Sequence, residues 1–222
     1  MVLTALSVLF AACGDAGLLD TAGDRSKDFV FGDSLPTTST NAPTVIVPAG
    51  GGKLVSTRSV AWLNDTLSDS NTGSADFVIA KVWQRRTDET RFVQASRAEI
   101  AAAVPGIFFP TAVPEDVTWV TSQLVFDLAS ATLDADVSAA FGLWSVDPYT
   151  SEEGRRGILR VGSSGGTTLV EGEIRPEQTD LGFVMTWVVG TYRYELFCPI
   201  PISETACRET AESSRPLASQ LP

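Results

Sequence analysis

Short apolar runs bounded by turn residues dominate the chain after Gly50-Gly51-Gly52, and they predict β-strands. Alternating or continuous Val, Ile, Phe and Trp positions are typical of half-buried strands. The runs are KLVSTRSVAWL, DFVIAKVWQRR, VTWVTSQLVFD, SAAFGLWSV, GILRVGSS, TTLVEGEIR and FVMTWVVGTYRYELF. The GSSGG segment between two of these runs predicts a hairpin turn, and Gly190 in VVGTYRY predicts another.

Two segments depart from this pattern and predict helices. In SRAEIAAAV, Ser96 can cap the first free amides and Glu99 can reach back to the cap, while Pro105-Gly106 ends the segment. In SETACRETAESS, Ser203 is the expected cap and Pro216 follows the end. The predicted fold is therefore α+β, a curved antiparallel, half-barrel-like sheet with two helices packed on one face. We expect it to form a single domain over residues 51–222.

The first 13 residues predict an export signal. Residues 1–12 are apolar and uncharged, and they end in Ala11-Ala12 before Cys13. The run is shorter than the roughly 20 residues that a membrane-spanning helix needs, but it has the size of a signal-peptide core. The segment Phe10-Ala11-Ala12-Cys13 resembles a bacterial lipoprotein signal, which implies that cleavage before Cys13 leaves its sulfur to carry a diacylglyceryl group. An ordinary cleaved leader and a structural N-terminal segment are the alternatives.

Residues 13–50 predict a lipidated cysteine followed by a flexible, disordered tether. The segment is rich in Gly, Asp, Ser, Thr and Pro, with SLPTTSTNAPT at its centre. Such a composition cannot bury enough apolar surface to offset the entropy of ordering it. A flexible spacer suits a domain that is held away from a membrane surface.

Charge and composition exclude several classes of function. The 27 acidic residues outnumber the 16 Lys and Arg, giving a formal charge of −11, so we expect no nucleic-acid partner. The chain has no histidine, which excludes Ser-His-Asp and Cys-His catalysis and zinc sites built on imidazole. An enzyme of this composition would have to rely on carboxylates, Lys, Tyr or a Ser-Lys pair.

The other two cysteines predict a disulfide. Cys198 ends the last apolar run and Cys207 lies early in the final helix, so a bond between them would pin that helix to the sheet. A redox pair is the alternative, although the spacing is not Cys-x-x-Cys. Pairing these two leaves Cys13 alone, which favours its lipidation.

The segment IFFPTAVPEDVTWVTSQLVFD, the hairpin LGFVMTWVVGTYRYELF and the final CRETAESSRPL together resemble an uncharacterised domain family. That family occurs in extracytoplasmic lipoproteins and anti-sigma-linked proteins of Gram-positive bacteria, and the resemblance covers residues 105–217. The family is similar in turn to the half-barrel fold of periplasmic lipoprotein carriers and envelope-stress sensors. The resemblance implies a binding or regulatory module without catalytic residues.

Aromatic residues are the candidate ligand contacts. Trp62, Trp83, Trp119, Trp144 and Trp187 each fall in a different predicted strand. Several of them on the concave face of the sheet could bind an acyl chain or a sugar ring, and we single out Trp119, Trp144, Trp187 and Tyr192. Packing in the core is the alternative use of such residues.

The acidic residues suggest no metal site. Asp134 and Asp136 in TLDADVS could ligate calcium, but no Gly or Glu completes a calcium loop. A solvated turn is the simpler interpretation, and we expect no metal or other cofactor.

Together these patterns predict an extracytoplasmic lipoprotein, anchored to the cell membrane or secreted, that is not an enzyme. We expect it to bind an apolar ligand or an envelope protein. The alternatives are a carboxylate-dependent hydrolase, whose two acids would face one polar cleft, and a purely structural envelope protein.

Overall fold

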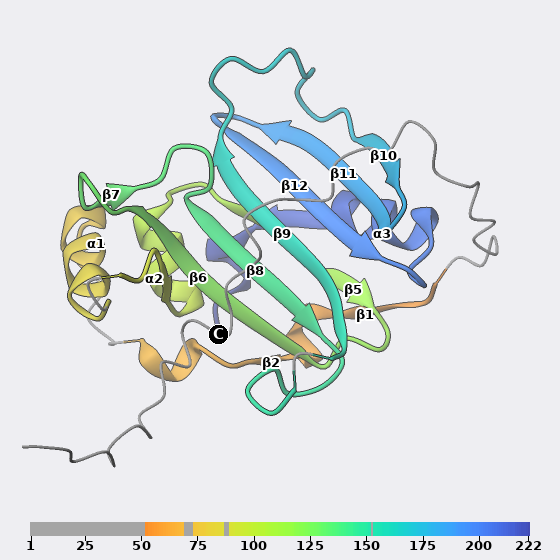
Figure 1. The fold of residues 1–222 in the computed structure, drawn as a ribbon, viewed down its shortest axis with the longest axis horizontal. Coiled ribbons are helices and arrows are strands. Elements are labelled where there is room, and N and C mark those ends of the chain that lie inside the picture. Colours follow the sequence, from red (N-terminus) through yellow and green to blue (C-terminus); the bar gives the residue numbers. More distant parts are fainter. Residues whose placement is uncertain (1–51, 69–72, 87–88, 152) are drawn as a thin grey trace, which may run out of the picture.

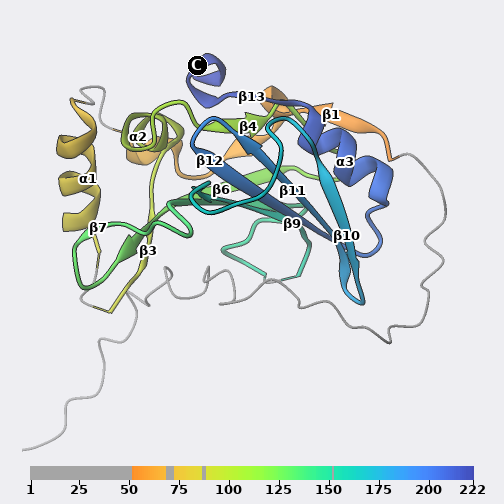
Figure 2. The same ribbon diagram turned by 90° about the horizontal axis from the view of Figure 1, so that it is seen from above.

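The fold is built on one open, mostly antiparallel sheet with helices on one of its faces (Figures 1 and 2). The structure is a computed structural model that describes residues 52–68, 73–86, 89–151 and 153–222. The predicted signal peptide (1–12) and the whole of the predicted lipidated cysteine and tether (13–50) lie outside the described residues. The α+β class and the open antiparallel sheet predicted from the sequence are confirmed.

The main path of the sheet runs through seven strands. In spatial order they are β10 (Arg175–Thr179), β11 (Gly182–Val189), β12 (Tyr192–Pro199), β9 (Arg155–Ser163), β8 (Ala139–Trp144), β6 (Trp119–Asp127) and β2 (Ala61–Trp62). Among these strands of the described residues, only the β2–β6 pair is parallel. The predicted hairpin around Gly190 is confirmed, because β11 and β12 pair from Gly182↔Pro199 to Val189↔Tyr192. Gly190 has φ +57° there, a conformation that glycine adopts without steric cost.

Short strands extend the main sheet and form two small separate sheets. β3 (Phe92–Gln94) and β7 (Thr132–Leu133) also pair with β6. Between β2 and β3, buried Asn64 takes the place of a strand, because its side-chain oxygen accepts the backbone N–H of Ser122 at 2.8 Å. Two separate two-stranded ladders join β1 (Leu54–Ser56) to β5 (Ala112–Pro114) and β4 (Phe108–Pro110) to β13 (Ser214–Pro216).

Two helices form where the sequence predicts them. α2 (Arg97–Ala103) begins with the predicted capping box, in which Ser96 accepts from the Glu99 N–H and the Glu99 side chain accepts from the Ser96 N–H. Glu99 is buried and also forms an ion pair with Arg85. α3 (Glu204–Glu212) begins at the predicted cap Ser203, whose side chain accepts from the Ala206 N–H. Short 3₁₀ helices lie at Thr57–Ser59, Asp65–Leu67 and Leu217–Gln220.

The run DFVIAKVWQRR was wrongly predicted as a strand, and it forms a third helix, α1 (Ala75–Gln84). Ser74 caps it by accepting from the Phe77 N–H at 3.4 Å. Val78 and Val82, four residues apart, are both buried against the core. Trp83, expected in a strand, therefore lies on a helix, and its ring packs on Phe126 at 4.7 Å between centroids.

The prediction between β9 and β11 was also wrong in part. Most of TTLVEGEIR is irregular, and the strand β10 begins only at Arg175, the last residue of that run. The GSSGG segment does not join two paired neighbours, because β9 pairs with β12 and β8. β10 is an edge strand whose side chains are mostly exposed and polar. It was missed because a search for apolar runs does not detect such a strand.

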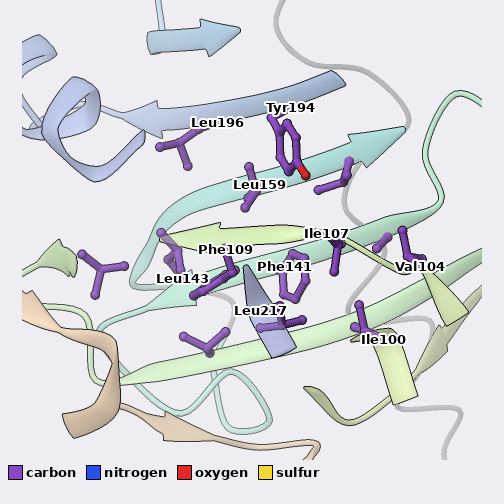
Figure 3. Packing of buried hydrophobic residues seen from close by; sticks show 14 of the residues in the cluster. Ile100, Val104, Ile107, Phe109, Phe141, Leu143, Leu159, Tyr194, Leu196 and Leu217 are labelled. Carbon is purple, nitrogen blue, oxygen red and sulfur yellow. The ribbon is translucent and has the colours of Figure 1, made fainter. Parts of the chain in front are cut away.

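The core fills the space between the sheet and the helix layer (Figure 3). At its centre the Phe141 ring from β8 lies 4.8 Å from Phe109 of β4 and 6.4 Å from Trp62. Ile100 of α2, Leu159 of β9 and Leu217 near the C-terminus complete the packing and are fully or almost fully buried. Side chains therefore fill the centre of the space between the sheet and the helices.

The predicted disulfide between Cys198 and Cys207 is confirmed. The sulfur atoms lie 2.06 Å apart and the Cα atoms 6.0 Å apart. Both cysteines are buried, so the bond joins the end of β12 to the first half of α3 inside the core.

Candidate functional site

The four aromatic residues singled out from the sequence lie on two different faces of the sheet. Trp119 and Trp144 are cross-strand partners on β6 and β8. Both alternate with core positions of their strands, so their side chains lie on the face away from the helices. Trp187 on β11 belongs to the core between the sheet and the helices, and Tyr192 on β12 packs against that core. The structure therefore brings Trp119 and Trp144 together and places Trp187 and Tyr192 on the other face, so the four residues do not form one aromatic site.

Trp144 is held in place by polar contacts. Its indole N–H donates to Thr121 Oγ1 at 3.1 Å, and the Arg155 guanidinium lies 4.9 Å from the ring centroid. The ring is 1% exposed, whereas Trp119 beside it is half-buried. In this pair, Trp119 is the ring with more surface for a ligand.

The other two candidate residues lie on the core side of the sheet. Trp187 stacks on Tyr194 with the ring centroids 5.1 Å apart and the planes 11° apart. The Tyr192 hydroxyl donates to the Pro105 carbonyl at 3.2 Å, and burial raises the pKa of this phenol. Trp187 therefore packs in the core, and Tyr192 joins β12 to the segment just after α2.

Tyr194 provides a test of this packing. Burial raises the pKa of Tyr194 to about 12, with a smaller contribution from the nearby Tyr192. The hydrogen bond that its hydroxyl accepts from the Phe108 N–H, at 3.0 Å, opposes this shift. Above pH 10 the unfolded chain loses this proton while the folded chain keeps it, so the folded state binds more protons and stability falls as pH rises. We expect the free energy of unfolding to fall by roughly 2 kcal/mol between pH 10 and 12 because of this residue.

Denaturant titrations of the wild type and Tyr194→Phe over this pH range measure the effect. The variant keeps the ring but lacks the ionising hydroxyl, so its stability should fall less steeply. Parallel curves for the two proteins would contradict a buried, neutral Tyr194.

The sheet face opposite the helices carries a second set of apolar side chains, which we call the outer face. Residue parity in β6, β8, β9, β11 and β12 assigns its members, all opposite in parity to the core residues of the same strands. Its centre comprises the apolar residues Ala140, Ile158, Val184 and Phe197, together with the polar residue Gln123. Each of these is at most 9% exposed, although the three helices pack on the other face (Figure 2).

Charged side chains lie beside this apolar centre. Arg160 of β9 is opposite both Ala140 and Glu195 in the register of the sheet. Arg193 and Glu195, two residues apart on β12, form an ion pair at 2.9 Å. The outer face thus combines an apolar row, Ile158, Phe197 and Val184, with a neighbouring row in which Arg160 and Glu195 lie beside Ala140.

Gln123 is a site residue that the sequence did not reveal. It lies on β6 between Ala140 and Gln94 and is 1% exposed. Its side-chain oxygen is buried without a hydrogen-bond partner. A buried acceptor without a partner is costly, so a donor from a bound segment would be stabilising here. Only the pairing register could place this residue on the outer face.

A small cavity of about 220 Å³ lies where the C-terminus meets the start of α2. Arg97 lines it, but its Nε donates to Asp65 at 2.7 Å and its Nη1 to the Gln220 carbonyl at 3.0 Å. The same guanidinium lies 4.6 Å from the Trp62 ring centroid. Arg97 therefore holds the C-terminal segment against the domain.

The acidic turn at Asp134 and Asp136 is held by hydrogen bonds within the turn. One Asp134 oxygen accepts the N–H groups of Asp136 and Val137, and the other pairs with Arg91. Among the residues that the structure describes, no group of three His, Cys, Asp or Glu side chains could hold a metal ion. No helix within the same ranges is long and apolar enough to cross a membrane.

Comparisons with known proteins add no assignment. No family model, no curated protein and no solved structure matches the chain. The resemblance of residues 105–217 to an extracytoplasmic lipoprotein domain therefore stays a prediction, as does lipidation of Cys13.

Proposed function

We propose that this protein is an extracytoplasmic lipoprotein, anchored to the membrane through Cys13, whose domain is a non-catalytic binding module. The Cys198–Cys207 disulfide supports export, because such bonds persist in oxidising compartments. The lipoprotein-like sequence ending at Cys13 supports the anchor.

The outer face is the proposed binding surface, and its apolar centre is the observation that carries the proposal. An antiparallel sheet with water on one side normally shows polar side chains there. Here Ile158, Val184 and Phe197 are neighbours across three adjacent strands on the side away from the helices. The ligand class that suits them is apolar, namely an acyl chain or the apolar side chains of an extended segment from an envelope protein.

A carboxylate-dependent hydrolase is less well supported. Its two acids would have to face one cleft. Glu99, the one buried carboxylate among the described residues, is engaged by its capping box and by Arg85. Asp65 is engaged by Arg97. No observation favours this function over binding.

Cell fractionation tests the anchor. The wild type and Cys13→Ala are expressed in a bacterial host, and the intact mass of each is measured. We expect the wild type in the membrane fraction with a diacylglyceryl mass on Cys13, and the variant outside it. A soluble, unmodified wild type would overturn the anchor.

A fluorescent fatty acid tests the binding surface. The double variant Ile158→Thr/Val184→Thr keeps β-branched side chains in both strands but places hydroxyls on the outer face. We expect saturable binding by the wild type that weakens about tenfold in the double variant, which corresponds to about 1.4 kcal/mol. Val170→Thr, on an exposed loop, is the matched control and should bind as the wild type does. No saturable binding, or equal binding by all three proteins, would contradict the proposed surface.

A further inference from the structure

Gln123 needs a hydrogen-bond donor that the described chain does not supply. The residue is 1% exposed, and its Oε1 atom has no hydrogen-bond partner. Burial at this level keeps bulk water away from the oxygen, so a donor must belong to a group that packs directly on the side chain. An unpaired buried acceptor is destabilising, and a ligand that brings a donor removes this penalty.

The side chains around Gln123 explain why its oxygen is unpaired. Ala140 lies opposite it on β8, and Phe92 and Val137 pack against the apolar cluster that includes Ala140. None of these three side chains has a donor. Gln94, opposite on β3, does have an amide, but it forms no hydrogen bond with the Gln123 oxygen.

Small residues lie on β8 between Gln123 and the apolar row. Ala140 is opposite Gln123, and Gly142 is opposite Ile158. A glycine inside a strand often marks a place where another backbone approaches the sheet closely. A bound chain that crosses β8 here can therefore contact both Gln123 and Ile158.

We propose that the ligand of the outer face is an extended peptide. It donates one backbone N–H to the Gln123 oxygen and places apolar side chains on the row formed by Ile158, Phe197 and Val184. The inference rests on the proposed function of the outer face and names its ligand class.

The chemistry of Gln123 favours a peptide over a fatty acid. A peptide carries a backbone N–H at every residue except proline. A fatty acid is ionised at neutral pH, and its carboxylate oxygens only accept hydrogen bonds. An acyl chain can fill the apolar row, but it leaves the Gln123 oxygen unpaired.

The spacing of the strands sets the length of this peptide. Between Gln123 on β6 and Val184 on β11 the sheet contains β8, β9 and β12. Neighbouring strands lie about 4.8 Å apart, so the path from β6 to β11 is about 19 Å long. An extended chain covers about 3.3–3.6 Å per residue, so a segment of about six residues spans the site.

Removing single N–H groups from a peptide tests the hydrogen bond. The probe is a fluorescein-labelled hexapeptide in which valine and serine alternate, and each of its variants carries one N-methyl group on a different backbone nitrogen. Fluorescence anisotropy measures their affinities for the wild type and for Gln123→Met, which keeps a side chain of similar length without the amide oxygen. We expect methylation at one position to weaken binding to the wild type about tenfold and to leave binding to Gln123→Met unchanged.

Each comparison is made between two peptides on one protein, so a general change of affinity in a variant cancels. A steric effect of the methyl group would appear in both proteins, and equal losses at every position would overturn the proposal. Gln94→Met is the matched control, one strand away, and it should show the same position-specific loss as the wild type. Disappearance of the loss in Gln94→Met but not in Gln123→Met would also overturn the proposal.

The fatty-acid titration separates this inference from the proposed function. The hexapeptide should displace the fluorescent fatty acid from the wild type, because both occupy the apolar row. Saturable binding of the fatty acid without binding or displacement by the peptide would overturn the peptide ligand and leave the binding surface supported. Failure of both probes to bind would overturn the binding function and the peptide ligand together.

Discussion

Replacing Phe141 with alanine is expected to lower the free energy of unfolding by about 4 kcal/mol, because truncating a buried phenylalanine removes apolar contacts and leaves a cavity. Phe141 lies at the centre of the core beside Phe109 (Figure 3) and is fully buried. The Trp62 ring also packs against it. Trp62 lies on β2 of the main sheet and Phe109 on β4 of a separate two-stranded sheet. Neither ring can move into the cavity left by the substitution without moving its strand. Urea unfolding followed by tryptophan fluorescence measures the loss.

Phe77→Ala is the matched control. Phe77 lies on α1 and is 53% exposed, and alanine favours helix, so we expect a change of less than about 1 kcal/mol. A similar cost for the two substitutions would show that the Phe141 ring is not packed as described. Most domains are stable by only about 5–15 kcal/mol, so Phe141→Ala should remove a large part of the total.

Removing the disulfide is expected to cost about 3 kcal/mol. Cys198 and Cys207 are nine positions apart, and the loop-entropy model gives this value for a closed loop of that size. The double variant Cys198→Ala/Cys207→Ala fills both buried positions with apolar side chains, so no unpaired thiol or hydroxyl confuses the result. Its urea midpoint should fall well below that of the oxidised wild type.

A reducing agent provides the control for this comparison. It should lower the midpoint of the wild type toward that of the double variant and leave the variant unchanged. A wild type that is insensitive to reductant under unfolding conditions would contradict a stabilising bond. Because the bond joins β12 to α3, hydrogen exchange should rise first in α3.

Local signals in the sequence were sufficient for α2, α3 and the long strands. Ser96 with Glu99, and Ser203 with the turn after it, specify helix starts through their own hydrogen bonds, which need no distant partner. The β11–β12 hairpin follows from apolar alternation on both sides of Gly190. These elements depend on neighbours within a few residues, so the sequence alone predicts them.

The helix α1 was missed because its apolar positions satisfy two periods at once. Val78, Ile79, Val82 and Trp83 follow a helical spacing, but with Phe77 they also form a nearly continuous apolar run rich in strand formers. The Ser74 cap was the signal that could have decided for a helix. Burial of Val78 and Val82 against the core overrides the β-propensity of the side chains.

Long-range pairing was beyond the reach of the sequence, and the candidate site depends on it. The two halves of the outer face meet only because β9 lies between β8 and β12. Trp119 and Trp144 share a face, and Trp187 lies on the other, as a result of register between strands. The aromatic residues could be found from the sequence, but their partition between two faces could not.

The contacts of Leu217 and β13 with earlier parts of the chain determine when the core can close during translation. Leu217 is fully buried and donates its backbone N–H to Ile107 at 2.8 Å, and β13 pairs with β4 beside Phe109. Translation supplies residue 107 well before residue 217, so the nascent domain cannot close its core until residue 217 has been synthesised. During that interval the apolar side chains around Phe109 stay uncovered, and they are the part of the growing chain that a chaperone would be expected to hold.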